Sequence, residues 1–386
     1  FYDRFPYPGD PLQDGPPPGY NWRWCHVAAH AHCTGRLPAP GPVPHILDAG
    51  CGTGVSTDYL VHLNPGASVT AIDISAGALE VAGERLRRSG GEAAVRFACR
   101  SLLDLAGEGP FEHINSVGVL HHLADPSGGL RALAGVLAPG GLLHLFLYAD
   151  GGRWEIHRLQ RSLRLLGVGT GAQGLELGRR LLAELPADNR LRRRHEERWA
   201  LDTQADANFA DMYLHPQETS YNLERLMAFV ASADLQFAGF SNPAVWDPAR
   251  LLQGDLLARA QALPPLQRWR LVEDLDPDIS HFEFFLAKGP LTPHSWGEDT
   301  ALLAASGQRN RCLWGWPGRA LLDSDMAPLD LSAEGLALLQ ALEQVPAGTA
   351  LADLPLGWPA GQIAAVAREL LAQRVLLLCP GPSPAA

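Results

Sequence analysis

The 386-residue chain lacks any apolar run that approaches the ~18 residues of a membrane-spanning helix, so the sequence predicts no membrane anchor. It also lacks an excess of positive charge, because its formal net charge is −11. Nonspecific nucleic-acid binding depends on clustered Lys and Arg that displace counterions, and we therefore expect no nucleic-acid partner. A hydrophobic fraction of 46% with 19% charged residues is typical of a soluble globular protein.

Paired cysteines are missing as well. The scattered cysteines are Cys25, Cys33, Cys51, Cys99, Cys312 and Cys379. Without a C-x-x-C pair or a short disulfide framework, they favour a reducing cytoplasm. Because the chain starts at Phe1 and not at methionine, the sequence leaves a preceding targeting segment open. His26, His30 and His32 have spacing that resembles a metal site, but no acid or cysteine pair accompanies them, and we expect no metal.

An apolar run, three alternating glycines and a helical pattern follow one another in HILDAGCGTGVSTDYL, residues 45–60. This order is typical of a strand that ends in a tight turn and opens onto a helix, which is half of a βαβ unit. Gly50, Gly52 and Gly54 allow positive φ and a close approach of ligand to backbone. The dinucleotide fingerprint G-x-G-x-x-G would need glycine where Val55 stands, so NAD is not favoured.

Two acids accompany this turn. Asp48 lies two residues before the first glycine, where a carboxylate favours a cationic ammonium over a diphosphate. Asp73 ends the next strand candidate, ASVTAIDIS, where a carboxylate can accept hydrogen bonds from both hydroxyls of a ribose. Ile74 follows it with an apolar face for a purine.

Four motifs in order, ILDAGCGTG, AIDIS, INSVGVLHHLADP and LAPGGLLHLFLYA, resemble the class I S-adenosylmethionine-dependent methyltransferases over residues 44–150. The resemblance implies an α/β fold with a doubly wound, Rossmann-like seven-stranded sheet that binds S-adenosyl-L-methionine. Asp48 and the glycine loop would hold the methionyl end, Asp73 the ribose and Ile74 the adenine. This family commonly has an acid for the adenine amino group where the present sequence has Ser101, so we expect a weaker contact there. The implied cofactor-binding residues are Tyr2, Tyr7, Asp48, Gly50, Cys51, Gly52, Thr53, Gly54, Asp73, Ile74, Ser101, Leu102 and Val119.

The rest of the chain predicts additions to this core. We expect an N-terminal arm or lid in residues 1–43, the methyltransferase domain in 44–290, and a small α-rich, winged-helix-like domain in 300–380. The segments LQFAGF and SHFEFFLAKG suit two final antiparallel strands. Insertions at 168–225 and 241–279 would build an acceptor pocket. The last helix candidate has only two arginines, which favours packing or partner binding over DNA reading.

Methyl transfer needs an aligned acceptor, and a base where the nucleophile carries a proton. His121 and His122 follow the fourth strand candidate, where the methyl group would point, and are candidate bases; helix capping is their alternative role. Outside the core, the chain resembles multi-domain bacterial methyltransferases that carry a regulatory domain, some of which methylate protein lysines. That resemblance implies an acceptor mouth, with ordinary packing as the alternative, at Tyr148, Arg153, Tyr213 and His215.

Three functions fit the sequence. The leading hypothesis is methylation of protein lysine side chains, so that the acceptor substrate is itself a protein, and it predicts an open, acidic cleft. A small-molecule methyltransferase is the enzyme alternative, and it predicts a closed apolar pocket roofed by residues 200–225. The third hypothesis is a catalytically idle S-adenosylmethionine-binding protein, against which the complete glycine loop and the ribose acid argue.

The proline-rich N-terminal segment is unusually aromatic for a disordered tail. We expect residues 1–24 to fold over the cofactor cleft, with Tyr2 or Tyr7 hydrogen-bonded to the methionyl carboxylate. A contact within a homodimer is the alternative.

Overall fold

The computed structural model describes residues 2–39 and 41–381. They form two compact units, each assembled from separate segments of the chain. The segments fall within residues 1–15, 45–58 and 68–289 for the first unit, and within 16–44, 59–67 and 290–386 for the second. The predicted domains are continuous ranges, whereas these units divide the N-terminal arm between them. Among the described residues, no helix is both long and apolar enough to span a bilayer.

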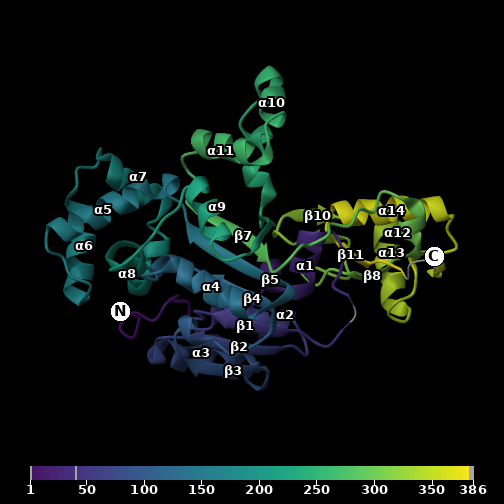
Figure 1. The fold of residues 1–386 in the computed structure, drawn as a ribbon, viewed down its shortest axis with the longest axis horizontal. Coiled ribbons are helices and arrows are strands. Elements are labelled where there is room, and N and C mark those ends of the chain that lie inside the picture. The colour runs from purple at the N-terminus through teal and green to yellow at the C-terminus, as the bar shows by residue number, and fades with distance from the viewer. Residues whose placement is uncertain (1, 40, 382–386) are drawn as a thin grey trace. The chain divides into compact units, whose positions relative to one another are not determined.

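The first unit is built on a seven-stranded sheet of order β3-β2-β1-β4-β5-β7-β6 (Figure 1). The strands are β1 (His45–Ala49), β2 (Ser68–Asp73), β3 (Val95–Cys99), β4 (Phe111–Val117), β5 (Leu137–Tyr148), β6 (Gln236–Phe240) and β7 (His281–Ala287). β7 pairs antiparallel with β5 and β6, and the remaining neighbours pair in parallel. The predicted α/β class and Rossmann-like seven-stranded sheet are confirmed.

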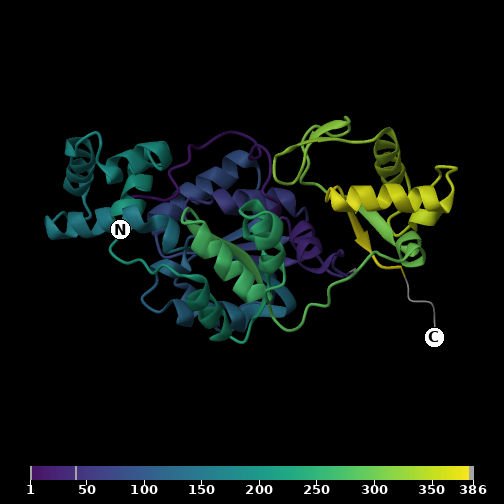
Figure 2. The same cartoon turned by 90° about the horizontal axis from the view of Figure 1, so that it is seen from above.

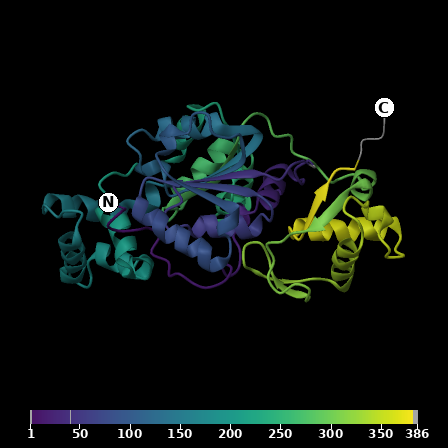
Figure 3. The ribbon, with the colours of Figure 1, turned by 90° about the horizontal axis from the view of Figure 1, so that it is seen from below.

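Helices lie on both faces of this sheet (Figures 2 and 3). The connecting helices are α2 (Val55–Leu63), α3 (Ala76–Ser89), α4 (Pro126–Val136) and α9 (Leu223–Ala231). At the start of α3, the hydroxyl of Ser75 accepts a hydrogen bond from the N–H of Ala78, and Gly90 ends the helix in the left-handed conformation, as the sequence predicts. Buried apolar side chains from the strands and helices, among them Leu47, Ile114, Leu133, Leu143 and Phe284, form the core.

Two helical insertions follow β5 and β6. The first carries α5 (Trp154–Leu165), α6 (Ala172–Glu184), α7 (Arg190–Arg198) and α8 (Asp206–Leu214), and the second carries α10 (Gly254–Gln261) and α11 (Pro265–Leu275). The first insertion has an apolar core of its own, which includes Leu159, Leu175 and Phe209. Phe5 of the N-terminal arm is buried in that core. The beginning of the arm is therefore part of the packing of the first unit.

The second unit has its own elements and its own core, which includes Leu302, Leu338 and Ile363. Its elements are α1 (His26–Thr34), α12 (Asp299–Ala304), β8 (Ser306–Arg309), β9 (Ala320–Leu322), β10 (Pro328–Asp330), α13 (Ala333–Gln344), α14 (Ala360–Ala372) and β11 (Leu376–Cys379). β8 pairs antiparallel with β11, and β9 with β10. In a winged helix a hairpin follows the last helix, whereas the β9–β10 hairpin precedes α13. The winged-helix-like assignment is not confirmed and stays a prediction.

Candidate active site

A cavity of about 560 Å³ lies in the first unit, beside the carboxyl ends of β1, β2 and β4. Its volume falls in the range of roughly 300–1,000 Å³ that is usual for small-molecule sites. The predicted site residues in its lining are Tyr2, Tyr7, Gly50, Gly52, Asp73, Ile74, Ser101, Leu102, Val119, His122 and His215. The predicted site residues outside its lining are Asp48, Cys51, Thr53, Gly54, His121, Tyr148, Arg153 and Tyr213.

The glycine loop between β1 and α2 forms one wall of the cavity. Gly50 has φ of 81° and Gly52 has φ of 52°, a region that side chains other than glycine rarely adopt. A Cβ atom on Gly52 would lie 2.2 Å from the carbonyl oxygen of Tyr7, and one on Gly50 would lie 2.4 Å from Cγ2 of Val119. Backbone conformation and crowding therefore both require glycine here.

Asp73 ends β2 beside this loop. One carboxylate oxygen accepts a hydrogen bond from the N–H of Gly52, and the other accepts one from the N–H of Ser75, both at 2.9 Å. A carboxylate has about four lone-pair sites, so each oxygen can accept a further bond from a ligand hydroxyl in the cavity. Burial raises the pKa of Asp73, which increases the benefit of such donors to the ionised form.

We call the part of the cavity formed by the glycine loop, Asp73, Ile74 and Ser101 the cofactor half. Its end at Ile74, opposite the glycine loop, is apolar and open to solvent. Ile74 lines the cavity and is 68% exposed, an unusual exposure for an isoleucine unless a ligand covers it. Leu103 lines the cavity and is also exposed. The hydroxyl oxygen of Ser101 accepts a hydrogen bond from the N–H of Leu103, and its own proton stays available for a ligand.

Asp48 lies beneath the glycine loop and does not face the cavity. Its side chain is buried, and one carboxylate oxygen accepts hydrogen bonds from the hydroxyls of Ser56 and Thr57. The other oxygen accepts a hydrogen bond of 2.8 Å from the amide of Asn115. Asp48 thus ties the start of α2 to β4, which corrects the expectation of a direct ligand contact: it supports the loop from below.

The N-terminal arm covers the glycine loop. The N–H of Thr53 donates to the carbonyl of Tyr7 at 3.1 Å, and its hydroxyl donates to the carbonyl of Pro8 at 2.7 Å. Arg85, buried on α3, donates to the carbonyls of Asp10 and Pro11. Tyr2, Asp3, Tyr7 and Pro8 of the arm line the cavity, while residues from 16 onward belong to the second unit. The role of the arm as a lid stays a prediction.

The acceptor half is the part of the cavity lined by Tyr2, His122 and His215. Gln217 of the first insertion forms a hydrogen bond with each of the two histidines. Nδ1 of His122 lies 3.0 Å from the carbonyl of Gln217, so this nitrogen donates. Nδ1 of His215 accepts a hydrogen bond of 3.1 Å from the N–H of the same Gln217. The neutral rings are therefore opposite tautomers: Nε2 of His122 has a free lone pair, and Nε2 of His215 carries a proton. Burial lowers the pKa of both, that of His215 to about 4, which keeps them neutral.

Asp211 adjoins these histidines, although it does not line the cavity and is not predicted from the sequence. The hydroxyl of Tyr2 donates to its Oδ1 at 3.1 Å, and the hydroxyl of Tyr148 donates to its Oδ2 at 3.3 Å. Nε2 of His122 lies 3.8 Å from Oδ1. Burial raises the pKa of Asp211, so its ionised form requires a positive or hydrogen-bonding partner. Asp211 stands four residues before His215. Residues with this spacing lie on the same face of a helix, so the spacing is a signal in the sequence that the two side chains are neighbours.

Three other candidates lie behind the acceptor half. His121 is fully buried and stacks on the ring of Tyr148 with a centroid distance of 3.8 Å. The guanidinium of Arg153 lies over the ring of Tyr148, 3.4 Å from its centroid, and pairs with Glu218. Tyr213 packs within the first insertion. These side chains support the site and do not line the cavity.

Residues 47–143 match a family model described as a methyltransferase domain. These residues form a methyltransferase domain, and the sheet that contains them has the fold of the class I S-adenosylmethionine-dependent methyltransferases. The predicted enzyme class and cofactor, S-adenosyl-L-methionine, are confirmed.

Relatives of this methyltransferase differ in how much of it they match. The uncharacterized protein syc1184_c of Synechococcus sp. is 51% identical across 98% of this chain and 92% of its own length. The ubiquinone biosynthesis O-methyltransferase of Caulobacter sp. is 38% identical, but that match spans 28% of this chain and 42% of the enzyme. PKMT2 from Rickettsia typhi has a TM-score of 0.61 at 17% identity, covering 94% of this chain and 77% of its own, and it shows the fold alone.

S-adenosylmethionine fits the residues of the methyltransferase cavity. Asp73 has spare acceptor sites for the ribose, and the exposed face of Ile74 suits the adenine. The backbone from Gly50 to Gly52, with Tyr7 over it, would then hold the methionyl end. His122 and His215 line the remaining part of the cavity, where an acceptor would meet the methyl group that the cofactor supplies.

The acceptor half also has the residue types of a metal site. Ligand atoms of His122, Asp211 and His215 lie within 4.8 Å of one another. However, Nδ1 of His215 already accepts the N–H of Gln217, so the neutral ring presents a proton at Nε2. A metal ligand needs a free lone pair, and this ring has none left. The prediction that the site needs no metal stays a prediction, and these hydrogen bonds favour it.

Proposed function

We propose that this methyltransferase transfers the methyl group to a primary amine, and that the amine is a lysine side chain of a protein. The observation that carries the proposal is the pair formed by Nε2 of His122 and Oδ1 of Asp211, 3.8 Å apart. Both atoms accept hydrogen bonds, and His122 has no proton on that side. A substrate amine with at least two N–H protons can donate one hydrogen bond to each of these two atoms.

Asp211 and the residues of the acceptor half have separate roles in the proposed reaction. Asp211, held by the hydroxyls of Tyr2 and Tyr148, binds the amine and orients its lone pair. Bound S-adenosylmethionine supplies an electrophilic methyl group on a sulfonium. As the new bond forms at nitrogen, Nε2 of His122 accepts the departing proton, and the carbonyl of Gln217 stabilises the imidazolium through Nδ1.

A protein lysine comes first for two reasons. Its amine stands at the end of a four-carbon apolar stem, which suits a cavity lined by aromatic rings: the centroids of the Tyr2 and His215 rings lie 5.5 Å apart. PKMT2, a protein lysine methyltransferase, also shares the fold over nearly this whole chain, which supports the proposal through fold alone.

A small-molecule amine is the second candidate. The observation that favours it is the position of Tyr2, whose hydroxyl occupies Oδ1 of Asp211 and whose ring closes the acceptor half. A lysine on a protein can enter only when this part of the arm moves, whereas a small amine can be enclosed under it.

The experiment that separates the two candidates is methyl transfer from tritium-labelled S-adenosylmethionine into a Synechococcus lysate, because a close relative occurs there. The proposal predicts label in the protein fraction and, after acid hydrolysis, in methylated lysine. Label confined to small molecules would favour the second candidate instead. Asp211→Asn, which keeps the shape of the side chain, is the matched control and should bind cofactor without transferring the methyl group.

We further propose a cytoplasmic enzyme, since the cysteines in the described residues are all free. The negative net charge supports a protein or small-molecule acceptor over nucleic acid. Homodimer formation stays a prediction that size-exclusion chromatography with light scattering tests.

A further inference from the structure

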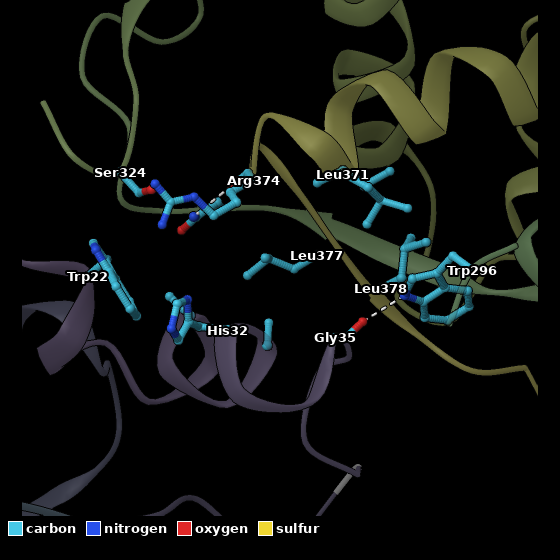
Figure 4. Close-up of a pocket in the computed structure, with 13 residues that line it drawn as sticks. Trp22, His32, Gly35, Trp296, Ser324, Leu371, Arg374, Leu377 and Leu378 are labelled. Carbon is cyan, nitrogen blue, oxygen red and sulfur yellow. Dashed lines mark hydrogen bonds between the residues drawn. The ribbon is translucent and has the colours of Figure 1, made fainter. Parts of the chain in front are cut away.

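A second cavity, of about 240 Å³, lies wholly within the second unit (Figure 4). It is lined by residues of α1, of the turn between β9 and β10, and of the end of α14 with β11. Its lining consists of Trp22, Ala28, Ala31, His32, Gly35, Trp296, Asn310, Ser324, Leu371, Arg374, Leu376, Leu377 and Leu378. None of these residues belongs to the methyltransferase cavity.

One side of this cavity is aromatic and apolar. Trp22 is buried, and its ring lies 4.6 Å from the ring of His32, measured between centroids. Leu377 and Leu378 of β11 face the same space (Figure 4). Flat rings opposite leucine side chains make a slot that suits a planar apolar molecule.

The other side of the cavity is polar. Ser324 is 5% exposed, and its hydroxyl has no hydrogen-bond partner within the described part of the chain. Leaving a buried hydroxyl unsatisfied costs about 1–3 kcal/mol, so this group calls for a ligand atom. Among the described lining residues, Arg374 is the only one with a permanent charge. Figure 4 places it beside Ser324, and its guanidinium carbon lies 5.8 Å from the centroid of the Trp22 ring.

Arg374 is held in place by its neighbours. Its guanidinium pairs with Asp325, which also accepts a hydrogen bond of 3.0 Å from the indole N–H of Trp22. Buried Asn310 donates to the carbonyl of Arg374 at 2.9 Å. The bond to Asp325 uses part of the five N–H donors of a guanidinium, and the others stay available for an acceptor in the cavity.

The backbone of Arg374 adds an independent observation. This residue follows α14 with φ of 56°, and the N–H of Val375 donates to the carbonyl of Leu370 at 2.9 Å. Glycine usually takes this helix-ending position, because the left-handed conformation costs another residue about 1–2 kcal/mol. Strained positions of this kind cluster at ligand-binding sites. Here the strained residue is the charged side chain that lines the cavity.

We propose that this cavity binds a small planar aromatic carboxylate. The ring lies in the slot beside Trp22, His32 and Leu377, and the carboxylate accepts hydrogen bonds from Arg374 and Ser324. Van der Waals contact with flat rings selects planar molecules, and the paired donors select an anion. The site is separate from the methyl-transfer reaction, so the methyltransferase takes a ligand besides its cofactor and acceptor.

The test is calorimetric titration of the full chain with indole-3-carboxylate and with benzoate, and with indole as the uncharged control. We expect one carboxylate per chain to bind at submillimolar concentration, and indole to bind at least about tenfold more weakly because it lacks the charged hydrogen bonds. Absence of binding by both carboxylates overturns the proposal.

Two glycine variants make the test specific. Arg374→Gly removes the guanidinium and suits the left-handed backbone, so it should weaken carboxylate binding at least about tenfold without lowering the melting temperature. Met326→Gly is the matched control, because Met326 has φ of 62° in the same unit and lies outside the cavity lining. It should leave the affinity unchanged. Equal carboxylate affinity in Arg374→Gly and the unmodified chain would contradict the assignment.

Discussion

The two halves of the methyltransferase cavity are built in different ways. The cofactor half comes from short segments that each follow a strand: Gly50 and Gly52 after β1, Asp73 and Ile74 at the end of β2, and Ser101 after β3. The acceptor half joins Tyr2 of the arm, His122 after β4 and His215 of the first insertion, with Asp211 of that insertion behind the lining. The fold therefore fixes the first half, and tertiary packing of added segments determines the second.

This difference predicts that affinity for the cofactor and turnover can be changed separately. Substitutions in the cofactor half should act on binding, and substitutions in the acceptor half should act on the transition state.

The largest effect is expected for His122→Asn. Removing the atom that accepts the proton should lower kcat about 10²–10⁴-fold, with cofactor affinity nearly unchanged. His121→Phe is the matched control, since His121 is buried, stacked on Tyr148, and without hydrogen bonds at its ring nitrogens among the described residues. It should keep kcat within about threefold. Turnover assays with calorimetry measure both quantities, and equal losses in both variants would mean that neither histidine acts as a base.

Asp73→Ala should have the next largest effect. Loss of the carboxylate removes two charge-assisted hydrogen bonds and weakens S-adenosylmethionine binding by about 2–4 kcal/mol. Asp73→Asn keeps one acceptor oxygen near the N–H groups of Gly52 and Ser75 and should bind with intermediate affinity. Calorimetric titration measures both variants, and unchanged affinity in Asp73→Ala would remove the ribose assignment.

The pH dependence of kcat should distinguish the halves further. Burial lowers the pKa of His122, so its neutral, proton-accepting form persists to lower pH than that of an exposed histidine. On the acid side of the pH profile, measured with both substrates saturating, the pH at which kcat falls to half should therefore lie below the ordinary histidine pKa of about 6.5. A limb at or above that value, or one that persists in His122→Asn, would assign the titration to another group.

A smaller effect is expected for Tyr2→Phe. This change removes one hydrogen bond to Asp211 and keeps the ring, so kcat/KM should change by about two- to tenfold. Tyr59→Phe is the control, because Tyr59 and Pro18 both belong to the second unit, where the hydroxyl of Tyr59 donates to the carbonyl of Pro18. Equal effects on kcat/KM in the two variants would show that the arm hydroxyl has no particular role at the site.

The sequence predicts the residues of the cofactor half better than those of the acceptor half. The glycine loop and Asp73 are recognisable because their spacing is set by one strand, one turn and one helix. Asp211 was missed because its contact with Tyr2 joins residues far apart in sequence. Asp48 has the right residue type and position for a ligand contact, but the neighbouring hydroxyls of Ser56 and Thr57 compete for its carboxylate.

The N-terminal arm shows a further limit of sequence reasoning. The sequence predicts that its aromatic residues pack against other parts of the protein, but it does not show that Phe5 enters the core of the first insertion. Nor does it show that Trp22 belongs to the second unit. Such packing depends on the shapes of surfaces that form only after distant segments fold. The arm is thus core packing for part of its length and also contributes to the lining of the cavity.

The chemical identity of the methylated atom tests the central claim, that Asp211 and His122 receive an amine. Methyl transfer from S-adenosylmethionine carrying a ¹³C-labelled methyl group, followed by two-dimensional proton–carbon NMR of the product, distinguishes a methyl carbon on nitrogen from one on oxygen or carbon. The proposed site predicts an N-methyl signal that is lost in Asp211→Asn. An O-methyl or C-methyl product, or an N-methyl product formed equally well by Asp211→Asn, would contradict it.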